Sequence, residues 1–326
     1  MAERVGSFPS KRKLTFGDCA YQAIDKHFKK SVKYKAEVLK DRDPEPLHQM
    51  RVGMRRLRTA LQVFAPAIHG PVSVRQVTKI AKALGQIRDL DVLYIWFQQY
   101  MYQRALTPAE ALELQLLLRR LQQHRGEQFY LIETLLKGKS YRAFVNATQA
   151  WLQEPRYKSL APLSIEMVLP DLLLPLMADL FLHPAWMAAV AEPSEKIVPL
   201  KIADGETLKQ DFGQWEPLLH DLRKQMKRVR YQTEFFIDFY GEDFKRQIEE
   251  FRLLQDRLGL LQDQMVLDQF LTRDLGTNWT IKLPSLAQYF DQERWQLWQQ
   301  WQSHQRQYLD PDFRRALRSQ LLNFKS

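Results

Sequence analysis

The chain has 326 residues, a formal net charge of +10 at pH 7, a pI near 9.5 and one cysteine. This length can bury a substantial core in one large domain or two. The lone Cys19 excludes an intramolecular disulfide, fits a reducing compartment and predicts a small buried residue on the first helix. The positive charge indicates an acidic partner, which at this point is nucleic acid, an anionic membrane surface or inorganic polyphosphate.

The composition predicts an all-α protein. Glycine is scarce, Leu, Gln, Arg, Ala and Glu are plentiful, and long stretches have the apolar period of about 3.6 residues that helices show. Residues 1–14 are expected to form a flexible basic N-terminus without the apolar core of a signal peptide. The predicted helices that follow are 15–40, 46–65, 72–104, 108–137, 141–153, 171–191, 205–240, 243–274 and 286–309. The prolines at or near their ends are Pro44, Pro46, Pro66, Pro71 and Pro108.

The predicted helix 46–65 carries a basic stripe on one face. At about 100° per residue, His48, Arg51, Arg55 and Arg58 fall within an arc of roughly 80°. An apolar arc lies about 120° away and can face a core. No acidic residue occurs between positions 47 and 64, so repulsion among these cations is not relieved within the helix. The stripe is a solvated face, a face paired with acidic residues of other helices, or an anion-binding surface.

The same pattern occurs a second time in the chain. LHQMRVGMRRLRTALQVF at 47–64 matches LHDLRKQMKRVRYQTEFF at 219–236, and LGQIRDLDVL at 84–93 matches LGLLQDQMVL at 258–267. Two matches in the same order indicate an internal duplication of roughly 170 residues, much longer than the repeats of solenoids. Because both basic stripes begin with a histidine, an anion-binding role is favoured over a solvated face. The second stripe consists of His220, Arg223, Lys227 and Arg230.

The first half also carries a family resemblance. His-x-x-Arg-x-x-x-Arg-Arg-Leu-Arg from His48, followed by Leu-Gly-x-x-Arg-Asp-Leu-Asp-Val-Leu from Leu84, resembles the signature of the CHAD family, the conserved histidine α-helical domain. The resemblance implies a basic groove or pore, lined by the two stripes, that binds inorganic polyphosphate, often at polyphosphate granules. It also implies a single domain at 15–320, made of two four-helix bundles related by a pseudo-twofold axis, half A at 15–160 and half B at 161–320.

Both stripes are expected to supply polyphosphate-binding residues. Guanidinium groups form fork-like hydrogen bonds with phosphate oxygens, and arginines at i, i+4 and i+7 rise about 6 and 10.5 Å along a helix. Two such helices facing one another would contact several successive phosphates. The predicted main contacts are His48, Arg51, Arg55, Arg58, His220, Arg223, Lys227 and Arg230. The predicted second tier is Arg56, Lys82, Arg88, Lys224 and Arg228.

The two histidines are expected near the N-terminal ends of helical segments, where the macrodipole favours an anion. His48, which follows Pro44 and Pro46, is the clearer case of the two, and His220 is the other. A neutral imidazole there donates a hydrogen bond, and a nearby polyanion that raises its pKa adds a positive charge. The alternative is a histidine bonded to a neighbouring backbone carbonyl.

The second motif contains acidic residues that would repel phosphate. Asp89 and Asp91 are therefore expected to orient arginines of the stripe, and Asp263, which matches Asp89, has the same expected role. The second half departs from the first at Gln262 and Met265, which stand where Arg88 and Asp91 stand.

An enzyme is the first alternative to a binding protein. CHAD domains are commonly joined to a triphosphate-hydrolysing domain with a Glu-x-Glu-x-Lys strand motif, and this sequence has no such motif. It also lacks a Walker-type glycine-rich loop, a Cys-x-x-Cys pair and a His-Glu-x-x-His motif. Basic residues beside both stripe histidines disfavour a metal cation. We therefore expect a non-catalytic protein with no cofactor and no metal.

Nucleic acid is the alternative partner, because a basic groove accepts any phosphate polymer. Trp295, Trp298 and Trp301 share one side of a predicted helix, and base stacking would need them exposed. Core packing or a partner-helix interface is the commoner explanation for such a stripe. Tyr231 is the only aromatic residue directly beside a stripe arginine, so polyphosphate is favoured over nucleic acid. Protein partners stay open.

The apolar stretch 167–191 is the one segment that resembles a membrane span. Prolines, aspartates and a histidine interrupt it, so no uncharged run of about 18 residues remains. A buried helix is expected there, with no membrane insertion. The predicted location is the cytoplasm, and the family resemblance implies association with polyphosphate granules.

Overall fold

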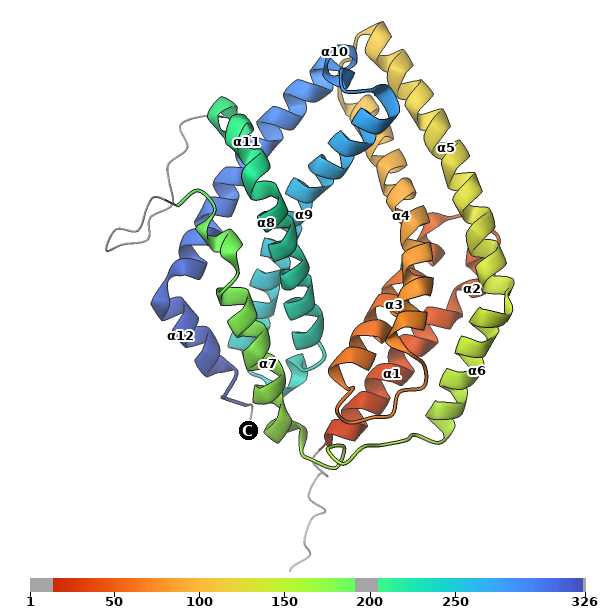
Figure 1. Ribbon diagram of the computed structural model, residues 1–326, viewed down its shortest axis with the longest axis vertical. Coiled ribbons are helices and arrows are strands. Elements are labelled where there is room, and N and C mark those ends of the chain that lie inside the picture. The colour runs from red at the N-terminus through yellow and green to blue at the C-terminus, as the bar shows by residue number, and fades with distance from the viewer. Residues whose placement is uncertain (1–13, 191–204, 325–326) are drawn as a thin grey trace, which may run out of the picture.

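The computed structural model describes residues 14–190 and 205–324, and the regular elements in those ranges are all helical (Figure 1). Two isolated β-bridges, Thr15 with Ser164 and Ile68 with Tyr157, form no strand in the described ranges. The all-α prediction is confirmed. The expected flexible N-terminus, 1–14, lies outside the described residues except for Leu14. The elements are α1 (Phe16–Lys33), α2 (Lys35–Val38), α3 (Pro44–Val63), α4 (Val74–Gln103), α5 (Pro108–Lys137), α6 (Lys139–Gln153), α7 (Ile165–Phe181), η1 (Pro184–Met187), α8 (Gly205–Thr233), η2 (Ile237–Phe239), α9 (Glu242–Leu275), α10 (Trp279–Lys282), α11 (Pro284–Leu309) and α12 (Pro311–Gln320).

Most predicted helices agree with the observed ones to within a few residues, but three predictions are wrong. The helix predicted at 15–40 is broken at Tyr34, where φ is −94° and ψ is 3°, and this break separates α1 from α2. The helix predicted at 205–240 ends at Thr233, and a short 3-10 turn follows it. Helices α10 and α12 were not predicted from the sequence. The signal for α12 is Asp310, whose carboxylate accepts the first backbone N–H groups of that helix.

The third wrong prediction is the helix at 171–191. The observed α7 begins earlier and ends at Phe181, and it contains Pro170 and Pro175. A proline inside a helix removes a backbone hydrogen bond and usually ends the helix. Four leucines on one face, from Leu169 to Leu180, are at most 3 % exposed, so the burial of this face outweighs the cost of the prolines. The helix α8 continues through Pro217 in the same way.

Two groups of helices lie side by side in Figure 1. In the first half of the chain α1 packs on α3, α3 on α4 and α4 on α5, and in the second half α7 packs on α8, α8 on α9 and α9 on α11. This repeated order supports the internal duplication that the sequence indicates. Between the two groups α3 contacts α8, so the two basic stripes lie next to one another.

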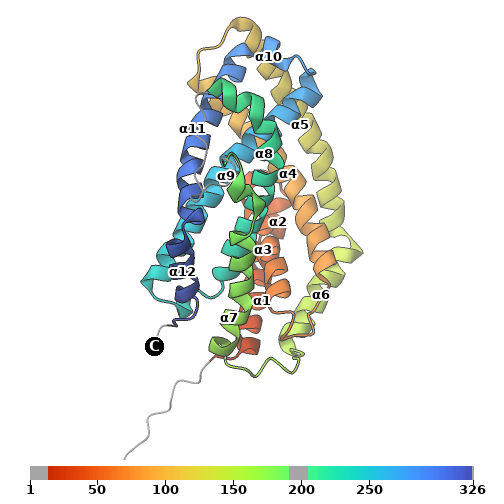
Figure 2. The same cartoon turned by 60° about the vertical axis from the view of Figure 1, so that its left-hand side comes forward.

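The hydrophobic core is shared by both groups. One cluster of buried side chains joins α1, α3 and α4 to α7, α8, α9 and α11. A second cluster joins α4, α5, α9 and α11 near the end of the molecule where α10 lies (Figure 2). Gly53 lets α3 approach α1 closely, because a Cβ atom there would lie 2.7 Å from the backbone nitrogen of Ser31. None of the described helices is long and apolar enough to cross a membrane.

Candidate functional site

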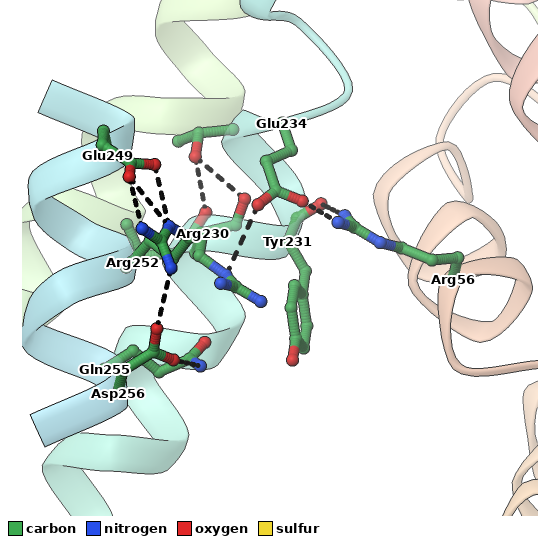
Figure 3. A network of polar contacts seen from close by, with 10 residues as sticks. Arg56, Arg230, Tyr231, Glu234, Glu249, Arg252, Gln255 and Asp256 are labelled. Carbon is green, nitrogen blue, oxygen red and sulfur yellow. Dashed lines mark hydrogen bonds and ion pairs between the residues drawn. The ribbon is translucent and has the colours of Figure 1, made fainter. Parts of the chain in front are cut away.

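The two basic stripes meet at one aromatic ring. Tyr231, on α8, is 6 % exposed, and the guanidinium carbons of Arg55, Arg56 and Arg230 lie 4.4, 4.8 and 4.8 Å from its ring centroid. Arg55 and Arg56 come from α3, whereas Arg230 comes from α8. Figure 3 shows Tyr231 between the helix that carries Arg56 and the side chain of Arg230. Cation–π attraction thus holds guanidinium groups of both stripes at a single point.

Lys227 shows that the cations of both stripes crowd together. Burial lowers the pKa of its amine from 10.5 to about 8, and repulsion by Arg223, Arg55 and Arg51 contributes to the shift. Arg51 and Arg55 lie on the other stripe, so positive charge from α3 reaches a side chain of α8. We use the name basic cluster for the six cations that these contacts bring together, Arg51, Arg55, Arg58, Arg223, Lys227 and Arg230.

Carboxylates neutralise only part of the basic cluster. Asp89 lies 3.8 Å from Arg51, and the matching residue of the second half, Asp263, lies 3.6 Å from Arg223. Glu234 lies 3.4 Å from Arg230 and also pairs with a guanidinium of α3. These pairs place Asp89 and Asp263 beside the arginines that they were expected to orient.

Three members of the basic cluster form no ion pair with any described residue. They are Arg55, Arg58 and Lys227. The Nε atoms of Arg55 and Arg58 are buried and have no hydrogen-bond partner in the described ranges. A buried donor without a partner costs stability, so this part of the cluster is suited to accept an anion.

The surroundings of the two aspartates indicate the shape of the surface at the basic cluster. The side chains of Asp89 and Asp263 are 70 % and 58 % exposed. Burial nevertheless raises the pKa of each carboxyl, against the opposing pull of Arg51, Lys227 and Arg223. A group that water reaches and that protein still surrounds lies in a recess rather than on a convex surface.

The Leu-Gly pair that occurs in both halves makes room for the stripe. A Cβ atom at Gly85 would lie 3.4 Å from Nε of Arg51, and one at Gly259 would lie 3.6 Å from Nε of Arg223. Each arginine therefore crosses the neighbouring helix directly over a glycine. No role was predicted for these glycines, although the Leu-Gly pair after each stripe was a signal in the sequence.

The two stripe histidines have different surroundings. His48 is the fifth residue of α3, and burial followed by the charge of Arg88 lowers its pKa. Its Nδ1 atom is buried without a hydrogen-bond partner in the described ranges, so the bond to a backbone carbonyl is not seen at that atom. The expectation for His220 is wrong, because α8 begins fifteen residues earlier at Gly205 and His220 lies inside the helix. Nδ1 of His220 contacts Oε1 of Gln262, the residue that replaces Arg88 in the second half.

Asp91 does not orient a stripe arginine, contrary to expectation. Its carboxylate is 5 % exposed and accepts a hydrogen bond of 2.6 Å from Nε of Arg125 on α5. Arg125 also binds the carboxylate of Asp41 at 2.6 and 2.8 Å. Through these contacts Arg125 links α4 and α5 to the loop before α3. Met265 stands at the matching position of the second half, so this tie exists in one half only.

The second-tier residues divide into two sets. Arg56 and Arg88 lie at the edge of the basic cluster, Arg56 against Tyr231 and Arg88 near His48. The other three are not brought into it. Lys224 and Arg228 are exposed and pair with Asp221 at 3.4 Å and Asp179 at 3.6 Å, and Lys82 is exposed with no described contact to the cluster.

The tryptophan stripe belongs to the core. Trp298 and Trp301 are 0 % and 1 % exposed, and their rings stack on Trp215 at 5.0 Å and on Trp186 at 5.2 Å. These rings are not accessible to nucleic-acid bases. No group of three or more His, Cys, Asp or Glu residues that could hold a metal ion occurs among the described residues.

Comparisons with known proteins agree with the helical fold. The chain is similar in fold to the CHAD domain from the plant Ricinus communis, with a TM-score of 0.60 and 21 % identity over 100 % of this chain and 99 % of that one. It is also similar to PptA from Streptomyces chartreusis, with a TM-score of 0.62 and 12 % identity over 90 % of this chain and 98 % of that one. No curated protein matches the chain. The family model of the CHAD domain matches residues 22–272, and the chain therefore belongs to the CHAD domain family.

Proposed function

We propose that the basic cluster binds inorganic polyphosphate and leaves the polymer intact. The observation that carries this proposal is the meeting of two arginine stripes from α3 and α8. Within the described ranges only three carboxylates pair with them, Asp89, Asp263 and Glu234. Six cations against three carboxylates leave a surplus of positive charge that a polyanion neutralises. Polyphosphate fits this surplus because its charges repeat along the chain, as the arginines repeat along each helix.

Arg55, Arg58 and Lys227 are the main contacts in this proposal. They have no ion pair with a described residue, and the Nε atoms of Arg55 and Arg58 lack any described partner. A guanidinium group binds phosphate oxygens with two parallel hydrogen bonds. Arg51, Arg223 and Arg230 would exchange a carboxylate for phosphate on binding.

The histidines have distinct roles in the proposal. His48 contributes a neutral imidazole that donates a hydrogen bond, because burial and Arg88 lower its pKa. His220 is oriented by Gln262. Binding without cleavage is proposed because five of the six cations are guanidinium groups, which act neither as nucleophiles nor as proton acceptors near neutral pH.

Polyphosphate is favoured over nucleic acid by the state of the aromatic residues. Tyr231 is covered by three guanidinium groups, and Trp298 and Trp301 are buried. Binding of single-stranded nucleic acid draws on base stacking over exposed rings. A protein that binds the polymer in this way would associate with polyphosphate granules wherever they form.

A competition titration at fixed salt tests the proposal. Long-chain polyphosphate, single-stranded DNA, single-stranded RNA and orthophosphate compete for the protein, and the length of the polyphosphate is followed on a gel. We expect polyphosphate to bind most tightly and to stay intact. Equal affinity for the nucleic acids would make the cluster a general polyanion site, and shortening of the polymer would indicate an enzyme.

A pair of matched variants locates the site. Arg55→Ala/Arg58→Ala removes two charges from the cluster, whereas Lys224→Ala/Arg228→Ala removes two charges from the exposed, ion-paired face of α8. Both lose the same net charge, so general attraction changes equally. We expect the first variant to bind polyphosphate at least tenfold more weakly than the second, which is about 1.4 kcal/mol. Equal weakening in both variants would refute the location.

A further inference from the structure

A second recess lies between α1, α3 and the segment that follows α8. Its volume is about 530 Å³, which falls within the range of roughly 300–1,000 Å³ typical of small-molecule sites. The cations that line it are Lys26 and Lys30 of α1 and Arg56 of α3. Arg56 lies about 100° from Arg55 around the helix. The recess therefore opens on a neighbouring face of α3, and Arg56 lies at its boundary with the basic cluster.

The lining of this recess carries several positive charges. Lys26 and Lys30 form no ion pair with any described residue, whereas Lys29 of the same helix pairs with Asp25. Burial, followed by the charges of Arg56, Lys26 and Lys30, lowers the pKa of His27 to about 4. Each charged residue that shifts this pKa is a cation, so positive potential dominates at the imidazole.

His27 itself offers an unused hydrogen-bonding atom. Its Nδ1 atom is buried and has no partner in the described ranges. Its ring lies edge-on to Phe235, with centroids 5.5 Å apart and an interplanar angle of 75°. The imidazole is neutral at physiological pH, so Nδ1 is either a donor or an acceptor, and it is closed to the recess in this conformation.

Acidic and aromatic residues complete the lining. Asp238 is exposed at the rim, and Glu234 is already shared by Arg56 and Arg230. The remaining wall includes the rings of Phe64, Phe235 and Phe239. Cations beside aromatic rings suit a ligand that has an anionic group at one end and a flat apolar ring at the other.

We propose that this recess binds a small phosphorylated ligand with an aromatic ring, of the nucleoside phosphate class. The phosphate lies between Lys26 and Lys30 and reaches Arg56, and the ring packs against Phe235 and Phe239. The site is separate from the basic cluster and does not depend on the function proposed for it.

The recess is coupled to the cluster through Glu234. Figure 3 shows this carboxylate between Arg56 on one side and Arg230 on the other. A phosphate that binds Arg56 displaces Glu234, which then pairs with Arg230 alone and competes more strongly with an anion there. A ligand in the recess therefore lowers the affinity of the cluster for a polyanion. By thermodynamic reciprocity, a bound polyanion lowers the affinity of the recess for its ligand by the same factor. This coupling, unlike the site itself, rests on the proposed polyphosphate function.

Calorimetric titration of the full chain with adenosine 5′-monophosphate tests the site. The recess variant is Lys26→Ala/Lys30→Ala, and alanine is well tolerated on a helix. Its matched control is Lys224→Ala/Arg228→Ala, which also loses two charges. We expect saturable binding to the unchanged chain, at least tenfold weaker binding to the recess variant, and unchanged binding to the control and to Arg55→Ala/Arg58→Ala. Loss of binding in Arg55→Ala/Arg58→Ala with retention in the recess variant would place the nucleotide in the cluster and overturn the proposal, as would no saturation at millimolar nucleotide.

A second titration tests the coupling. The affinity for long-chain polyphosphate is measured with and without saturating adenosine 5′-monophosphate, in the unchanged chain and in Glu234→Gln. We expect the nucleotide to weaken polyphosphate binding severalfold in the unchanged chain and to have a smaller effect in the variant. Nucleotide binding with no effect on polyphosphate would refute the coupling and leave the site in place. If the chain binds the nucleotide but no polyphosphate, the proposed function is refuted and the proposed nucleotide site in the recess stands.

Discussion

Lys227 offers the sharpest test of the electrostatics of the basic cluster. The amine lies among arginines of both stripes, and burial together with Arg223, Arg55 and Arg51 lowers its pKa from 10.5 to about 8. Lys227→Met keeps a long flexible side chain and removes the charge. We expect the variant to be more stable than the unchanged chain near pH 7 and to bind polyphosphate more weakly.

The size of the effect follows from the pKa shift. A decrease from 10.5 to about 8 corresponds to about 3 kcal/mol at ~1.4 kcal/mol per pKa unit. Below pH 8 the amine is protonated in both the folded and the unfolded chain, so the full penalty for burying the charge, to which the nearby arginines add, is present. Between about pH 8 and 10.5 the folded chain loses the proton first, and above that range both states are neutral. The free energy of unfolding of the unchanged chain therefore rises across this window.

Urea unfolding at a series of pH values measures the difference between Lys227→Met and the unchanged chain. We expect a difference of at most about 3 kcal/mol at pH 7 that shrinks as the pH rises from 8 towards 10.5. The control is Lys224→Met, because Lys224 is exposed on the same helix and pairs with Asp221. A difference that is the same at every pH, or one that Lys224→Met reproduces, would refute the crowding of cations around Lys227.

The same lysine links polyphosphate binding to protons. A bound polyanion favours the charged form of the Lys227 amine, so binding is accompanied by proton uptake. The uptake is about half a proton per site at pH 8, because half of the Lys227 amines are already protonated in the unbound protein at that pH. Calorimetry in two buffers with different ionisation enthalpies measures this uptake. Proton uptake that persists unchanged in Lys227→Met would assign it to another group.

Three further changes test particular contacts. Gly85→Leu places a side chain where Arg51 crosses α4, and we expect polyphosphate to bind up to about tenfold more weakly through the loss of one charge-assisted contact, with the melting temperature as the control for folding. Arg125→Ala leaves the buried carboxylate of Asp91 without its partner, and urea unfolding is expected to show a loss of roughly 3 kcal/mol; a neutral outcome would show that water replaces the guanidinium. Trp301→Ala opens a cavity in the core and is expected to cost about 3–5 kcal/mol of stability with no specific effect on nucleic-acid or polyphosphate affinity, whereas a selective loss of nucleic-acid binding would contradict its place in the core.

The features that the sequence alone determines are those that depend on local helical geometry. His48, Arg51, Arg55 and Arg58 share a face because successive residues turn by about 100°, whatever else the chain does. The helix limits at Pro44 and Pro108 follow from the fixed backbone of proline at a first turn. The family resemblance was likewise carried by residue spacing within single helices.

Prolines were less informative where packing is strong. The helix α7 passes through Pro170 and Pro175, since its leucine face is buried on the second group of helices. Local preference predicts an interruption there, and the free energy of burial overrides it. The limits of α7 were therefore beyond a prediction from local pattern.

The partners of the functional side chains were decided by tertiary structure. Asp91 is bound by Arg125, a residue of another helix, and His48 faces Arg88 whereas His220 contacts Gln262. Identical residues in two similar stripes thus acquire different surroundings. Such contacts join segments far apart in the chain, and no periodicity within one helix specifies them.

The meeting of the stripes has the same origin. The sequence supplies two amphipathic helices with like charge, which would repel if brought together without compensation. Packing of the shared core nevertheless holds α3 against α8, and Tyr231, Asp89, Asp263 and Glu234 offset part of the repulsion. The charge of each helix is a local property of the sequence, whereas the unneutralised surplus at their contact exists only because burial of apolar surface elsewhere in the fold forces them together.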